Sequence, residues 1–367
     1  MQLQRSNPDL DRLRAWLRER HDLHASLAAH DRPEALAAAL APLAAADGID
    51  ISEETLSTAI ALPPTAPPVD HWPPPGWLPA AILQAPDGAV IRWLHAGKAT
   101  FDAPFYEEAI APARYSPLNR LIDWRTRLDA LATTMPCAPV KPAGLIFHLS
   151  RCGSTLAARM IGACAGVAAF SEPDPVDKVV DRGDPAILAA MVTALARSRP
   201  DRQQLVIKLD SWHLSALPLF EQAFPETPWV VLYRDPAAIL ASHLRRPGSH
   251  MVKAAPAPGQ SAIEHYAARL GDLIDRAIDG LSNTRNGIAI DYAALPDVVA
   301  GRILPLFGIT PTIADLDAIA AIAGRDAKAP EARFDPAAMA QPDTTITAAA
   351  ATLDTRMAKL RGFNPTD

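Results

Sequence analysis

Residues 144–159 constrain the fold more than any other part of the chain. They begin with an apolar run from Leu145 to Leu149, turn at the polar residues 150–155, and continue into residues 156–161, which have the composition of a helix. A buried strand, a tight polar turn and a helix form the half-unit from which phosphate-binding loops are built. We therefore expect an α/β fold with an anion site at this turn.

The turn has the features that an anion site needs. Gly153 has no side chain, so the backbone can approach an anion closely. The N–H groups of Gly153, Ser154 and Thr155 lie at the helix start, where they lack helical partners. The turn is not a Walker A loop, because that motif requires a lysine immediately before the hydroxyl residue. Here Cys152 and Gly153 precede Ser154, and the cation of the loop is Arg151.

Composition limits the class of protein. A chain of 367 residues exceeds one typical core, so we expect one large α/β domain with an appendage. The net charge of −6 disfavours nucleic acid as a partner. The N-terminus lacks a signal-peptide core and no apolar run reaches membrane-spanning length, so we expect a soluble, cytoplasmic protein without a membrane partner.

The three cysteines, Cys137, Cys152 and Cys164, do not have metal-ligand spacing. An odd number in a chain of this size indicates reduced thiols, and we expect no metal site. Cys152 lies inside the anion loop, where we interpret it as a small residue that fits, in preference to a redox switch.

The sequence divides into four parts by composition. They are a helical unit at 1–61, a proline-rich linker at 62–79, an accessory α+β segment with a second linker at 80–142, and the α/β domain at 143–367. In the first part, Pro33 is suited to a helix start, Gly48 to a helix end and Ser52 to an N-cap. In the second, Trp72 and Trp77 are placed to pin the linker to a surface.

The accessory segment contains a predicted strand at 89–95 and a helix that starts at Phe105 and is interrupted by Pro112. A further helix is predicted over 118–131, with its arginines on a solvated face.

Strands and helices alternate after residue 143, which predicts a mainly parallel sheet with helices on both faces. The predicted strands are 144–149, 166–170, 205–209, 228–233 and 287–291. The predicted helices are 154–164, 185–198, about 213–223, 236–244, 261–281, 294–306 and 313–323.

Open α/β sheets bind ligands at the carboxyl ends of their strands. Charged residues follow the first four predicted strands, at 150–155, 171–173, 208–210 and 234–236. We expect these four strand ends to hold a doubly charged ligand.

The order cation-x-Gly-Ser-Thr after a strand resembles the phosphosulfate loop of the sulfotransferases. These enzymes transfer a sulfonate from 3′-phosphoadenosine-5′-phosphosulfate (PAPS). Arginine at the cation position, Arg151, is similar to the tyrosylprotein-type branch. Arg234 and Ser242, eight residues apart after the apolar strand 230–233, match the pair that grips the 3′-phosphate in this family. The late segment 288–309 resembles the closing strand and helix of the family, whereas its glycine-rich basic segment has only partial candidates at 245–248 and 361–362.

The resemblance implies a mechanism. Arg151 and Lys208 would stabilise charge on the leaving phosphate, because fixed cations aimed at developing charge lower a barrier. Ser154 and Thr155 would donate to the 5′-phosphate. A glutamate is similarly placed as the base in the tyrosylprotein-type enzymes, and this implies Glu172; His213 is the second candidate. Two other histidine and aspartate positions are interpreted as structural: His148 as a core residue and Asp235 as support for a helix start.

Two other functions stay open. One is a P-loop-type nucleotide-dependent kinase, for which Asp210 would be the metal ligand. The other is a non-catalytic nucleotide- or peptide-binding protein, favoured if Arg151, Glu172, Lys208, Arg234 and Ser242 do not converge on one cleft. Residues 1–61 also resemble the leader-peptide domain first seen in nitrogen-fixation clusters, although a helical packing or dimerisation unit explains them as well.

The acceptor is expected to be a small molecule or a peptide, and a homodimer stays open. Segment 243–260, with His250 and Lys253, has the composition of a lid over an acceptor pocket.

Overall fold

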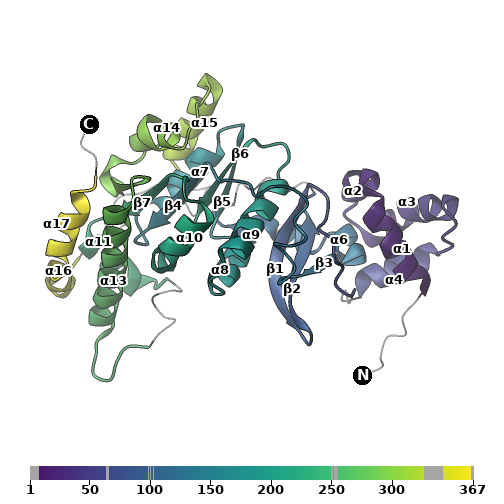
Figure 1. The fold of residues 1–367 in the computed structure, drawn as a ribbon, viewed down its shortest axis with the longest axis horizontal. Helices are drawn as coiled ribbons and strands as arrows, with labels where there is room; N and C mark the ends of the chain where they lie inside the picture. Colours follow the sequence, from purple (N-terminus) through teal and green to yellow (C-terminus); the bar gives the residue numbers. More distant parts are fainter. Residues whose placement is uncertain are drawn as a thin grey trace. The chain divides into compact units, whose positions relative to one another are not determined.

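The structure is a computed structural model that describes residues 8–62, 66–97, 99, 101, 103–248, 251, 255–325 and 342–364 (Figure 1). They form two compact units. The first extends to Val140 and includes the segments Asp174–Val179 and Ala189–Pro200. The second consists of Lys141–Pro173, Val180–Leu188 and the chain from Asp201 onward.

Four helices open the first unit: α1 (Pro8–Glu19), α2 (His21–Leu27), α3 (Pro33–Ala46) and α4 (Glu53–Ala61). Their predicted ends are confirmed. Pro33 stands in the first turn of α3, and Gly48 follows that helix with φ of 75°. The Ser52 hydroxyl caps α4 by accepting from the backbone N–H of Thr55 at 3.1 Å.

An antiparallel sheet follows in the same unit, with the order β1 (Trp77–Ala85), β2 (Gly88–His95) and β3 (Arg125–Arg127). Strand β2 matches the predicted strand at 89–95, whereas β1 begins inside the predicted proline-rich linker at 62–79. Trp77 is 1% exposed, and its indole N–H donates to Nδ1 of His24 at 3.1 Å. The end of the proline-rich stretch is therefore core, since its tryptophan is buried between a helix and the sheet.

The predicted helix over 118–131 is wrong. After α5 (Tyr106–Arg114), which contains Pro112 within it, α6 spans only Pro117–Ile122, and β3 follows. Asp123 ends α6 in the left-handed region, with φ of 44° and a fully buried carboxylate. That carboxylate pairs with Arg125 at 2.8 Å and with Arg92 at 3.5 Å. Arg125 thus lies beside a buried anion, and the solvated face expected for it is wrong as well.

The second unit contains the parallel sheet that the sequence predicts. Its order is β5-β6-β4-β7-β8, and all four strand pairs are parallel. The strands are β4 (Gly144–His148), β5 (Val167–Ser171), β6 (Gln204–Lys208), β7 (Trp229–Tyr233) and β8 (Gly287–Asp291). Each lies within one residue of its predicted bounds, and the α/β fold class with a parallel sheet flanked by helices is confirmed (Figure 1).

The connecting segments are mainly helical. They are α7 (Ser154–Gly162), α8 (Asp174–Val180), α9 (Pro185–Arg197), the 3₁₀ helix η1 (Ser211–Ala216), α10 (Leu217–Ala223), α11 (Pro236–Arg245), α13 (Ala262–Asn283), η2 (Tyr292–Ala294), the π-helix η3 (Val299–Ile303), α14 (Leu304–Leu306), α15 (Ile313–Ala323), α16 (Thr344–Ala351) and α17 (Asp354–Arg361). The helix predicted at 294–306 forms only from Asp297, and the sequence does not predict α8, α16 or α17. Asp235 caps α11 by accepting from the N–H of Ala238 at 2.9 Å, as expected.

The sheet topology fixes where a ligand can bind. From β4 the chain goes outward to β5, returns to β6, and then crosses to β7 on the other side of β4. The carboxyl end of β4 is therefore a topological switch point, where open α/β sheets bind their ligands. In the described part of the chain, none of the helices combines the length and the apolar character that a membrane crossing requires.

Candidate active site

The loop after β4 has an unusual backbone. Ser150, Arg151 and Gly153 all have positive φ, at 67°, 54° and 76°. Gly153 is the N-cap of α7 and contributes no capping side chain, so the N–H groups of the first turn stay open. A Cβ at this position would come within 2.5 Å of Cδ1 of Leu295 and 2.9 Å of Cδ2 of Tyr292. Only glycine satisfies both the conformation and the space.

His148 ties this loop to the neighbouring strand. Its Nδ1 accepts from the N–H of Ser150 at 3.0 Å, and its Nε2 lies 3.0 Å from the carbonyl oxygen of Leu209. Nε2 must carry the proton and Nδ1 must not, so the geometry specifies the neutral ring. Burial, with the nearby charge of Lys208, lowers the pKa of His148 in agreement. His148 is buried, as expected, and it also positions the loop.

Glu172 and Lys208 form an ion pair at the ends of β5 and β6. Lys208 is 1% exposed, and its ammonium contacts Oε1 of Glu172. The same oxygen lies 3.6 Å from Nε2 of His148. Burial by itself would raise the pKa of Glu172, but Lys208 and the contact with His148 outweigh burial and hold that pKa far below its usual range. Glu172 is therefore an ionised carboxylate, held in a left-handed conformation with φ of 52°.

Asp210 is a second acid in this group. Its Oδ1 accepts from the N–H of Ser211 at 2.9 Å, which starts η1. Burial, followed by repulsion from Glu172, raises the pKa of Asp210. The two carboxylates therefore sit in different environments, one stabilised as an anion by Lys208 and the other with a raised proton affinity.

His213, the second candidate for the base, is a buried residue of the capping box that starts η1. Its Nδ1 accepts from the N–H of Asp210 at 3.3 Å in the capping box of η1. The ring is 1% exposed, and its centroid lies 4.1 Å from that of Trp212 and 5.7 Å from that of Phe220.

The structure places two arginines around the loop. Arg151 donates to the carbonyl oxygen of Arg246 at 2.6 Å, and burial, with repulsion from Arg246, lowers its pKa. Arg234 donates to the carbonyl oxygen of Arg151 at 3.4 Å and lies over the ring of Tyr292, 4.3 Å from its centroid. The guanidinium of Arg234 thus reaches the anion loop from the carboxyl end of β7, the strand beside β4.

The remaining predicted residues differ in their placement. Ser154 and Thr155 are each 5% exposed in the first turn of α7. Ser242 lies six residues beyond Pro236 in α11, about 9 Å along the helix axis. Within the described residues, no hydrogen bond joins its side chain to the group above. His250 and Lys253, expected in a lid, lie outside the described residues.

Cys152 is a buried thiol that donates to the carbonyl oxygen of Leu232 at 3.0 Å. Burial raises its pKa to about 12, so it is uncharged at neutral pH and serves as the small loop residue that we expected.

The structure therefore brings together Arg151, Glu172, Lys208 and Arg234 around one loop. Sequence reasoning interpreted His148 only as a core residue and Asp210 only as a possible metal ligand, so it missed the contact of His148 with the loop and the interaction of Asp210 with Glu172. A histidine as the last residue of a buried strand, and an aspartate two residues after a strand-end lysine, were the signals available. Among the described residues, no cluster of three or more histidine, cysteine, aspartate or glutamate side chains has the arrangement of a metal site.

Comparison with known proteins gives structural neighbours only. No protein-family model matches the sequence, and no curated protein matches it. A sulfotransferase domain from the curacin biosynthetic pathway is 14% identical, covers 59% of this chain and 99% of its own, and has a TM-score of 0.41. A sulfotransferase domain from a Synechococcus olefin synthase is 14% identical, with coverages of 59% and 97% and a TM-score of 0.39. A Mycobacterium tuberculosis sulfotransferase is 14% identical, with coverages of 67% and 86% and a TM-score of 0.38.

Proposed function

We propose that this protein is a sulfotransferase that moves a sulfonate from PAPS to an acceptor hydroxyl or amine. One observation carries the proposal. An uncapped helix N-terminus, flanked by Arg151 and Arg234, adjoins an ionised carboxylate that is paired with a buried lysine. The helix N-terminus and the two arginines can bind an anionic donor. The ionised carboxylate can take a proton from an acceptor.

The residues fit a donor with phosphate at both ends. The open N–H groups of α7, with Arg151, Cys152, Gly153, Ser154 and Thr155, would hold the 5′-phosphosulfate. Arg234 and Ser242 would hold the 3′-phosphate. Non-glycine residues in the left-handed region are uncommon, and such strain collects at functional sites, which supports a role for the loop and for Glu172.

The chemistry is an in-line displacement. PAPS supplies the sulfonate: its sulfur–oxygen bond to the 5′-phosphate breaks, leaving the electron pair on phosphate, as the acceptor oxygen bonds to sulfur. Arg151 and Lys208 would stabilise that phosphate charge. Glu172 would take the acceptor proton.

A carboxylate paired with lysine is a weak base, so the pair must loosen for Glu172 to act. We propose that donor anions draw Lys208 away from Glu172. Burial is the largest influence on the pKa of Glu172 and acts to raise it. With Lys208 engaged elsewhere, that pKa moves upward toward the working pH, where a general base is most effective. Asp210 and His213 are the alternative bases.

Calorimetry with 3′-phosphoadenosine-5′-phosphate (PAP) and with ADP tests the donor site. PAP should bind more tightly, because Arg234 contacts its 3′-phosphate, and Arg234→Ala should remove that preference. A hydrogen bond between charged groups contributes about 1.5–3 kcal/mol, so the loss should be roughly 10- to 100-fold. Arg285→Ala, at an exposed arginine before β8, is the matched control. Equal binding of PAP and ADP by the unmodified protein would overturn the assignment.

A second experiment tests the base. Glu172→Gln should abolish PAPS-dependent sulfonation across a panel of hydroxyl acceptors and leave PAP affinity near that of the unmodified protein. An active Glu172→Gln variant would move the base to Asp210 or His213, which Asp210→Asn and His213→Gln would then separate.

A further inference from the structure

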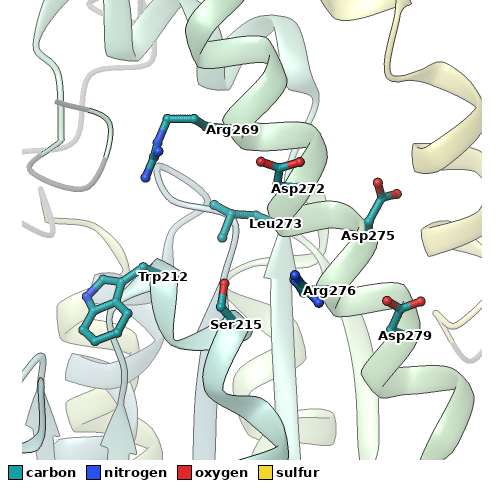
Figure 2. A pocket seen from close by; sticks show the side chains of 8 residues that line it. All are labelled: Trp212, Ser215, Arg269, Asp272, Leu273, Asp275, Arg276 and Asp279. Atoms are coloured by element: carbon teal, nitrogen blue, oxygen red, sulfur yellow. The ribbon is translucent and has the colours of Figure 1, made fainter. Parts of the chain in front are cut away.

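A pocket of about 460 Å³ lies between η1 and α13 in the second unit (Figure 2). Trp212 lines it from η1, and five charged residues and Leu273 line it from α13. The candidate active site described above does not use these side chains, so their arrangement requires its own explanation.

Four of the charged residues form one stripe along α13. Arg269, Asp272, Arg276 and Asp279 are spaced by three, four and three residues, so they lie on one face with alternating sign. Within the described part of the chain, none of these four side chains makes an ion pair or a hydrogen bond with another side chain. Nε of Arg269 is also buried without a partner among the described residues. The pocket therefore offers two cations and two anions that are not matched internally.

The fifth charge, Asp275, is already engaged. Both of its carboxylate oxygens accept from Nε of Arg356 in α17, at 2.9 and 3.0 Å. Figure 2 shows Asp275 on the side of α13 away from Trp212, whereas the guanidinium of Arg269 extends toward the tryptophan. Asp275 is thus a natural control for substitutions in the stripe.

The aromatic wall adjoins the candidate active site. Trp212 is two residues after Asp210, and two residues span at most about 7 Å. Asp210 in turn lies close enough to Glu172 for the two carboxylates to interact. Asp210 is the N-cap of η1 and Trp212 lies in that helix, so one short element belongs to both the candidate active site and the pocket.

We propose that this pocket binds the acceptor, and that the acceptor is dipolar. It would carry an ammonium for Asp272 or Asp279 and a carboxylate for Arg269 or Arg276, beside a flat portion that stacks on Trp212. The inference rests on the proposed sulfotransferase function, because the acceptor is the molecule that receives the sulfonate. A purely apolar alcohol fits poorly, since it would displace water from four charges and replace none of the lost hydrogen bonds.

A matched series of four phenols separates the contributions. Tyrosine carries both charges, tyramine only the ammonium, 3-(4-hydroxyphenyl)propionate only the carboxylate, and 4-propylphenol neither. Binding to the full chain with PAP present would be measured by saturation-transfer NMR titration. Tyrosine should bind about three- to tenfold more tightly than either singly charged probe, and 4-propylphenol should be the weakest. A 4-propylphenol affinity equal to that of tyrosine would overturn the proposal.

Single variants test which side chains produce this order of affinities. Arg269→Ala should reduce tyrosine to the affinity of tyramine, and Asp272→Asn should reduce it toward that of the propionate. Asp275→Asn, one turn away but already paired with Arg356, should leave the order unchanged. Unchanged selectivity in both Arg269→Ala and Asp272→Asn would also overturn the proposal.

The charges could belong to a free dipolar molecule or to the side chains of a peptide. The blocked tripeptide acetyl-Glu-Tyr-Lys-amide has no terminal charges, so preference for it over tyrosine identifies a peptide acceptor and the reverse identifies a small molecule. Failure of the donor proposal is distinguishable, because PAP and ADP would then bind equally while the order of the four phenols persists.

Discussion

The ion pair between Glu172 and Lys208 gives the sharpest prediction. Glu172→Gln removes one charge and takes away the carboxylate that pairs with Lys208, a side chain that is 1% exposed. Breaking a buried pair in this way costs about 3–5 kcal/mol. Since the Glu172 side chain is 24% exposed, water partly compensates, and we expect the lower end, about 3 kcal/mol. The double variant Glu172→Gln/Lys208→Met removes both charges and should return to within about 1 kcal/mol of the unmodified protein.

Urea unfolding at pH 7, followed by far-UV circular dichroism, measures these differences. The second unit contains its own control: Lys141 and Glu226 pair at 3.2 Å with side chains 53% and 82% exposed. Exposed pairs contribute about 0–1 kcal/mol, so Glu226→Gln should have little effect.

The pH dependence has a definite sign. The pKa of Glu172 is lowered in the folded state, so the contribution of the pair is complete above its unfolded pKa of about 4.3 and is lost as the pH falls below that value. The reasoning is refuted if Glu172→Gln is as stable as Glu226→Gln, or if the double variant is no more stable than Glu172→Gln alone.

Three further predictions concern other groups. Gly153→Ala places a Cβ 2.5 Å from Leu295 at a φ of +76°, so it should cost about 2–4 kcal/mol in urea unfolding and at least about tenfold in PAP affinity by calorimetry. Iodoacetamide at pH 8 should alkylate the exposed Cys137 and spare Cys152, whose pKa is raised to about 12 by burial; mass spectrometry showing modified Cys152 in the folded protein would contradict this. Burial lowers the pKa of His95 to about 4, below its unfolded value of about 6.5. The free energy of unfolding should therefore decline by about 3 kcal/mol as the pH falls from above 6.5 to 4. His95→Gln should remove most of this decline, as measured by urea unfolding at a series of pH values.

The parallel sheet was predictable because its strands are short apolar runs. Apart from His148, residues 145–149 are apolar, and so are residues 228–233; both stretches are followed by polar or charged residues, which is the pattern of strands buried on both faces. The secondary structure of the accessory segment was not predictable, because it depends on the buried side chain of Asp123. A single buried carboxylate, paired with Arg125 two residues later and with Arg92 from β2, ends α6 before the edge strand β3. Local periodicity contains no information about such pairing.

The sequence predicts which strand ends form the candidate site, but it does not predict the contacts between the side chains there. Arg151, Glu172, Lys208 and Arg234 follow strands whose carboxyl ends share one edge, so topology alone brings them together. The pairing of Glu172 with Lys208 depends on side-chain packing across two strands, and no spacing in the sequence specifies it. The same holds for His148, whose tautomer is fixed by one backbone donor and one backbone acceptor.

The membership of 174–179 and 189–200 in the first unit has a consequence for how this chain can be made and cut. Both segments are synthesised after β4 and β5, so the first unit cannot finish folding on the ribosome until residue 200 has emerged. A fragment that starts at residue 143 would also carry Val176 and Val179, both fully buried in the intact chain, without the rest of their unit. Truncation at the proline-rich stretches should therefore give insoluble protein, because it separates these buried segments from the rest of their unit.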